Sequence, residues 1–103
     1  MVIIETLIFT RLIMELMSDG EYQALQETLL QRPGIGVIIQ GTGGLRKLRW
    51  SLDGRGKSGG IRVIYYWQKN EEQLYMLYGY PKNEQENLTA DQKKLLRQIV
   101  ERW

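Results

Sequence analysis

The chain has 103 residues, of which 43% are hydrophobic, enough for one folded domain with a modest core but hardly for two. It contains no cysteine and no histidine, which excludes a disulfide framework and thiolate chemistry, nearly excludes a zinc site, and fits a reducing cytoplasm. The net charge of +2 hides a basic segment, because residues 44–62 hold six Lys or Arg against a single Asp. Such a segment predicts a polyanionic partner, with nucleic acid first.

The first elements predicted are a short strand and a helix. Residues 2–5 (VIIE) are mostly β-branched and indicate a strand, after which Thr6 is placed to cap a helix over 7–17. This apolar stretch lacks the basic start of a signal peptide, and Arg11 and Glu15 interrupt any run long enough to span a membrane. We therefore expect the core-forming sequence of a soluble, cytoplasmic protein.

A second helix follows directly. Residues 18–21 (SDGE) have the form of a capping box, in which Ser18 caps the helix and Glu21 reaches back, and the helix must end before Pro33. Two helices joined so tightly predict a hairpin that lies on one face of a sheet. Residues 34–44 then read as a glycine-punctuated connection.

From Leu45 to Leu52 the hydrophobic period changes to two, which predicts a strand. Arg46 shares one face of this strand with the apolar residues that should pack on the helices. Lys47 and Arg49 point to the other face, so we expect them side by side on the open side of the sheet.

Two more strands and a helix complete the chain. Residues 61–68 (IRVIYYWQ) and 73–80 (QLYMLYGY) predict strands joined by a polar turn, and residues 89–92 (TADQ) form a second capping box that opens a final helix. The fold class predicted for residues 1–103 is α+β: a strand, a helical hairpin, a three-stranded antiparallel meander and a C-terminal helix, in a single domain. We expect the helices to be segregated to one side of the sheet.

Residues 54–60 (GRGKSGG) match the spacing G-x-G-x-x-G and the end of a Walker A motif. Both motifs need a helix after the glycines, because the helix N-terminus supplies the amide donors for phosphate. Here a strand follows, and Ser51 stands where Walker A needs a glycine. We therefore expect a hairpin loop whose glycines serve the turn, and from which Arg55 and Lys57 can reach nucleic-acid phosphates.

The sharpest candidate site flanks this loop. Lys47, Arg49 and Arg62 can converge because the hairpin pairs its two arms, and such a cluster binds a phosphodiester and stabilises a phosphorane-like transition state. In RNA the 2′-hydroxyl is an internal nucleophile, so the reaction requires neither a metal nor a protein nucleophile. Neighbouring cations lower the pKa of Lys47 and favour it as a base, whereas the arginines act electrostatically. Five tyrosines are candidates for stacking on bases, although core packing is their commoner role: Tyr65, Tyr66, Tyr75, Tyr78 and Tyr80.

Three segments, GTGGLRKLRW at 41–50, GIRVIYYW at 60–67 and YGYPKNEQENLT at 78–89, resemble the RelE/HigB superfamily of bacterial toxins, and within it the HigB-like branch. The resemblance implies a compact α+β domain with a curved antiparallel sheet. It also implies a ribosome-dependent endoribonuclease that cuts mRNA in the A site without metal or cofactor and so inhibits translation. The implied partner is a cognate antitoxin, usually with a helix-turn-helix DNA-binding domain. The apolar patch at 37–39 is then either core or an antitoxin surface, and we favour core.

The resemblance also implies roles for particular residues. Lys47 and Arg49 fall where RelE-type toxins place two basic residues on the second strand, and Arg62 falls on the family's transition-state arginine. Lys82 falls near a further basic position, where it would bind phosphate or assist the leaving group. The RNA backbone, ribosomal or messenger, would be bound by Arg46, Arg55 and Lys57.

Two positions depart from the family pattern. Arg49 stands where RelE itself has a lysine proposed as the general base, so that role would pass to Lys47. Leu88 stands about where RelE has a tyrosine. Stacking on the target base must then come from another residue or be lost. The superfamily also contains ParE-type members, so a ParE-like gyrase inhibitor and a non-catalytic basic RNA-binding module are the two alternatives.

Overall fold

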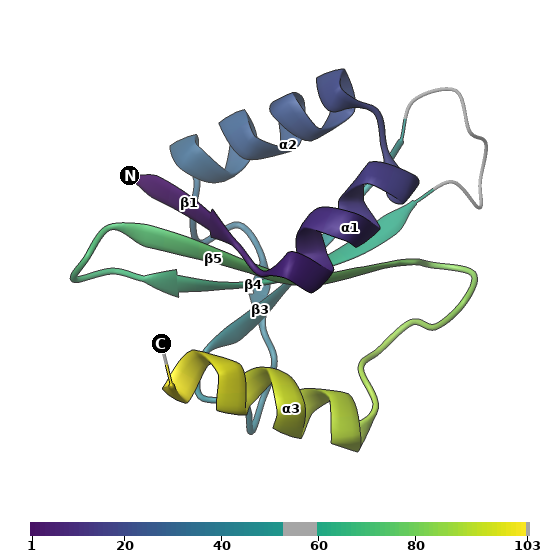
Figure 1. The fold of residues 1–103 in the computed structure, drawn as a ribbon. Helices are drawn as coiled ribbons and strands as arrows, with labels where there is room; N and C mark the ends of the chain where they lie inside the picture. Colours follow the sequence, from purple (N-terminus) through teal and green to yellow (C-terminus); the bar gives the residue numbers. More distant parts are fainter. Residues whose placement is uncertain (53–59, 103) are drawn as a thin grey trace.

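The computed structural model describes residues 1–52 and 60–102. No helix in these ranges is long and apolar enough to cross a membrane. The elements, in chain order, are β1 (Val2–Glu5), α1 (Leu7–Leu16), α2 (Asp19–Gln31), β2 (Val37–Ile38), β3 (Leu45–Trp50), β4 (Ile61–Gln68), β5 (Gln73–Pro81) and α3 (Ala90–Glu101) (Figure 1).

One five-stranded sheet, in the order β1-β5-β4-β3-β2, forms the middle layer of the described structure. The strands β3, β4 and β5 pair antiparallel in sequence order, while β1 pairs parallel with β5. The expected α+β fold, with its opening strand and three-stranded meander, is confirmed.

The helical hairpin forms as its capping residues predict. The Thr6 side chain accepts a hydrogen bond from the Phe9 backbone N–H at 3.0 Å, and Ser18 and Glu21 complete the capping box of α2. Both helices lie on the same face of the sheet (Figure 1). The core on this face is built around Phe9, Ile13, Leu25, Leu29, Leu48, Val63, Tyr65, Leu74 and Met76.

The last helix lies on the opposite face, so the expectation that all helices share one side is wrong (Figure 1). The physical reason is that the inner strands β4 and β5 are apolar on both faces, and each face needs its own cover. Leu96 of α3 is buried in a second core cluster together with Leu45, Ile64, Tyr75, Leu77, Tyr80 and Leu88.

The connection at 34–44 contains a strand that its glycines concealed. The two-residue β2 pairs antiparallel with β3 at the edge of the sheet. Val37 and Ile38 are 70% and 52% exposed, so the interpretation of this patch as core is wrong for both. An edge strand with no layer over its side chains leaves them in water, whereas Ile39 packs against the second core cluster.

Candidate active site

The pairing of β3 with β4 brings the predicted basic residues to one face of the sheet. Arg49 lies directly opposite Arg62, and Lys47 lies opposite Ile64. Residues opposite each other in an antiparallel pair project to the same side. The helix α3 packs on this same face of the sheet, because Ile64 and Leu96 of α3 belong to one core cluster. The expected convergence of Lys47, Arg49 and Arg62 is therefore present.

The three cations meet at one carboxylate, that of Glu86. Nη2 of Arg62 donates to the two carboxylate oxygens at 2.9 and 3.2 Å, and Nε of Arg62 reaches Oε1 at 3.4 Å. Nη2 of Arg49 lies 3.2 Å from Oε1, and Nζ of Lys47 lies 4.0 Å from it. A single carboxylate thus marks the point where the positive charges of β3 and β4 converge.

Arg62 and Glu86 differ sharply in exposure. The Arg62 side chain is 7% exposed, while that of Glu86 is 44% exposed. Hydrogen bonding from Arg62 lowers the pKa of Glu86, and the charges of Arg62 and Arg49 lower it further. The carboxylate therefore stays ionised beside a guanidinium that is fixed within the protein, because an unpaired buried cation would be costly.

Lys47 has a tight hydrogen-bonding position beside this carboxylate. Its Nζ donates to Oδ1 of Asn87 at 2.6 Å. Burial lowers the pKa of Lys47, the neighbouring Arg49 lowers it further, and Glu86 opposes this shift. A lysine with a lowered pKa provides more of the neutral amine that a general base requires.

Lys82 approaches the cluster from the end of β5. Together with Arg49, Arg62 and Gly60 it lines a hollow of about 350 Å³. Its side chain is exposed, and its backbone N–H donates to the Gly60 carbonyl at 3.0 Å. Three of the four residues predicted to be catalytic, Arg49, Arg62 and Lys82, therefore line one hollow, and Lys47 joins the two arginines through Glu86.

Arg46 does not join this cluster. It lies between Lys47 and Leu45 on β3 and projects to the opposite face, where its guanidinium donates to the carbonyls of Gly34 and Gly36 at 3.2 and 2.8 Å. It also lies 5.8 Å from the centre of the Trp67 ring. Arg55 and Lys57 lie outside the described residues, as does most of the loop at 54–60.

The tyrosines divide by position, and few are placed to meet a ligand. Tyr65 is buried on the hairpin side, where its hydroxyl accepts from the Gly36 N–H at 2.9 Å and donates to the Pro33 carbonyl at 2.7 Å. Tyr78 is half-buried, and its ring lies 5.7 Å from that of buried Tyr80. On β5, Tyr80 lies opposite Arg62. Leu88 is buried in the second core and has no role at the surface.

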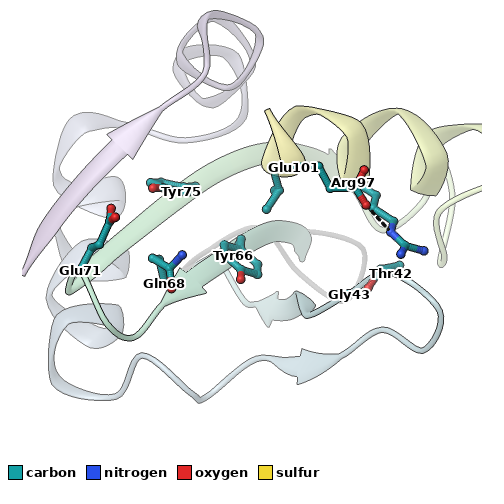
Figure 2. Close-up of a pocket in the computed structure, with 9 residues that line it drawn as sticks. Thr42, Gly43, Tyr66, Gln68, Glu71, Tyr75, Arg97 and Glu101 are labelled. Atoms are coloured by element: carbon teal, nitrogen blue, oxygen red, sulfur yellow. Dashed lines mark hydrogen bonds and ion pairs between the residues drawn. The ribbon is translucent and has the colours of Figure 1, made fainter. Parts of the chain in front are cut away.

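A second hollow lies at the far end of the same face, between β4, β5 and α3. Figure 2 shows that Tyr66 and Gln68 of β4, Tyr75 of β5 and Glu71 of the turn between these strands line it, together with Arg97 and Glu101 of α3, which form an ion pair. It contains none of the residues predicted to be catalytic.

Sequence reasoning missed Glu86 and Asn87, which together hold the cations in place. Their signal is an acidic and amide-rich stretch, KNEQEN, directly after the last strand. Charge complementarity with the basic segment could have drawn attention to it. The choice of Glu86 over Glu84 needs the path of the chain from β5 to α3, which the sequence pattern does not provide. Within residues 1–52 and 60–102, no group of three or more Asp, Glu, His or Cys is arranged to hold a metal ion.

The structure therefore defines an α+β protein with a cluster of cations on the sheet face that α3 partly covers. The family described as RelE toxin of the RelE/RelB toxin-antitoxin system matches residues 35–103, which include β2 to β5 and α3 and all the cations of the site. The chain belongs to this RelE toxin family. Its place in the HigB-like branch stays a prediction.

Proposed function

We propose that this toxin is an endoribonuclease that cuts mRNA in the ribosomal A site and thereby inhibits translation. The observation that carries the proposal is the convergence of Lys47, Arg49 and Arg62 on one point at 2.9 to 4.0 Å. Membership of the RelE toxin family supports the toxin role.

Substrate binding begins with the arginines. Arg62 is held rigidly by burial, and its planar fork matches the two non-bridging oxygens of a phosphodiester. Arg49 is more exposed and adds a second guanidinium from the neighbouring strand. Both favour the phosphorane-like transition state, in which negative charge on these oxygens increases.

Lys47 is the proposed general base. Its neutral amine takes the proton of the 2′-hydroxyl, whose oxygen attacks the adjacent phosphorus. The new bond joins O2′ to phosphorus, and the bond from phosphorus to O5′ breaks. The products are a 2′,3′-cyclic phosphate and a 5′-hydroxyl, with a proton delivered to the leaving oxygen, a step that Lys82 assists.

The ribosome and an antitoxin are the proposed partners. Arg55 and Lys57 would contact the RNA backbone non-specifically. Arg46, which the sequence pattern also favoured for this role, instead donates to two backbone carbonyls on the other face of the sheet. A cognate antitoxin with a helix-turn-helix domain would neutralise the toxin. A gene for such a protein beside this one would support the assignment.

Induced expression followed by mapping of transcript 5′ ends tests the proposal. We expect in-frame cuts that disappear in Lys47→Ala and in Arg62→Ala, while Lys94→Ala, which removes an exposed lysine of α3, keeps them. Fully active Lys47→Ala and Arg62→Ala variants would contradict the site. DNA damage without cuts would indicate a ParE-like gyrase inhibitor, and RNA binding without cuts would indicate a non-catalytic module.

A further inference from the structure

Glu86 occupies the point at which the proposed function places the scissile phosphate. We propose that the carboxylate of Glu86 occupies the phosphate site when no substrate is bound. There it pairs with Arg62 and Arg49, and RNA must displace it to bind them. The inference rests on the proposed function, because it takes the bound anion to be a phosphodiester.

The carboxylate matches a phosphodiester in charge and in shape. Each carries one negative charge and presents two oxygens to a guanidinium fork. Arg62 contacts both oxygens of Glu86, at 2.9 and 3.2 Å from Nη2, and Arg49 contacts one at 3.2 Å. A phosphodiester can therefore replace Glu86 without changing the charge of the cluster.

The exposures of the partners determine which of them moves. Arg62 is 7% exposed and cannot turn to water, so an anion must pair with it in every state. Glu86 is 44% exposed and lies in the irregular segment between β5 and α3, from which its side chain can rotate into solvent. Its backbone stays attached, since the Tyr80 hydroxyl donates to the Glu86 carbonyl at 3.2 Å.

Competition with a carboxylate weakens substrate binding without slowing the chemical step. The free energy of displacing Glu86 is the same whether the site then holds the ground-state phosphodiester or the transition state. The phosphorane-like transition state carries one more negative charge than the ground-state phosphodiester, so the cations still bind it more tightly than the bound substrate.

The test compares two charge-neutralising variants on the same segment. Glu86→Gln keeps the size of the side chain and removes its charge. Glu84→Gln makes the same charge change two residues earlier, at a residue that forms no ion pair with the three cations in the part of the chain described here. The probe is a 2′-O-methyl RNA trinucleotide, which carries phosphodiesters and cannot be cleaved.

We expect Glu86→Gln to bind the trinucleotide about tenfold more tightly than Glu84→Gln at the same salt, about 1.4 kcal/mol. Without RNA, Glu86→Gln should melt at a lower temperature, and the trinucleotide should raise its melting temperature more than it does for the wild type. A purely structural Glu86 would lower the melting temperature without tightening binding. Equal affinities of the two variants would overturn the proposal.

A second variant covers the case in which Glu86→Gln does not fold. Glu86→Asp keeps the charge but shortens the reach by one methylene, so its affinity for the trinucleotide should lie between those of the wild type and Glu86→Gln. The inference and the proposed function also fail separately. Mapped cuts with no gain in affinity would refute the inference alone, and a gain in affinity without any cuts would refute the proposed function alone.

Discussion

Arg46 and Arg49, three residues apart on β3, lie on opposite faces of the sheet and pair with different kinds of partner. Arg46 faces the helical hairpin, and two backbone carbonyls and the Trp67 ring surround its guanidinium. Arg49 faces the other side, where its contact is the side chain of Glu86. A carbonyl of the backbone cannot leave its cation, whereas a side-chain carboxylate can. The comparison teaches that a ligand site requires cations whose partners are exchangeable.

Removing Arg62 should have the largest effect on the face whose cations pair with Glu86. We expect Arg62→Ala to lower the rate of mRNA cleavage on programmed ribosomes by about 10²–10³, the effect of losing one preorganised transition-state contact. Arg46→Ala, a matched arginine on the other face, should keep cleavage within about threefold of the wild type, because Arg46 binds RNA at most non-specifically. Equal losses of cleavage rate in both variants would show that the two faces of β3 do not differ in function.

The hairpin side should instead respond in stability. Tyr65→Phe removes a hydroxyl that bonds both the Gly36 N–H and the Pro33 carbonyl, so the free energy of unfolding should fall by about 2 kcal/mol. Urea denaturation measures this change. The folded fraction should still cleave mRNA. A Tyr65→Phe protein that is stable but inactive would contradict the assignment of Tyr65 to stability and not to catalysis.

The pH dependence should report the base on the cation face. A general base works when deprotonated, so kcat/KM should rise as pH passes the pKa of Lys47, which burial and Arg49 place below that of an ordinary lysine. Glu86 raises this pKa, so Glu86→Gln should move the rise to lower pH. The control Glu84→Gln should leave the profile in place, and a profile unmoved by Glu86→Gln would argue against Lys47 as the base.

The smallest effect is expected at the sheet edge. Val37 is 70% exposed, so Val37→Thr should change the free energy of unfolding by no more than about 0.5 kcal/mol. Leu48→Ala on the neighbouring strand removes a buried side chain and should cost about 2–5 kcal/mol. Similar losses for the two, measured by thermal or urea unfolding, would show that β2 is more buried than the structure has it.

Local sequence rules predicted the elements well. The two capping boxes, Thr6 as a cap and the period of two in β3 are determined by residues within a few positions of each other, and each is present. The same period separated Arg46 from Lys47 and Arg49. Long-range arrangement was harder, because the position of α3 depends on how two apolar faces are covered. Glu86 was missed for a related reason, since its contact with Arg62 spans 24 residues of chain.

The central claim is that the cluster on β3 and β4 cleaves RNA through the substrate's own 2′-hydroxyl. The most direct measurement places a single 2′-deoxy nucleotide at the mapped cut site of an mRNA bound to the ribosome. Our account predicts that the wild-type protein leaves this mRNA intact, while it cuts the all-ribose mRNA to a 2′,3′-cyclic phosphate. Cleavage of the 2′-deoxy mRNA at the same position would contradict the account.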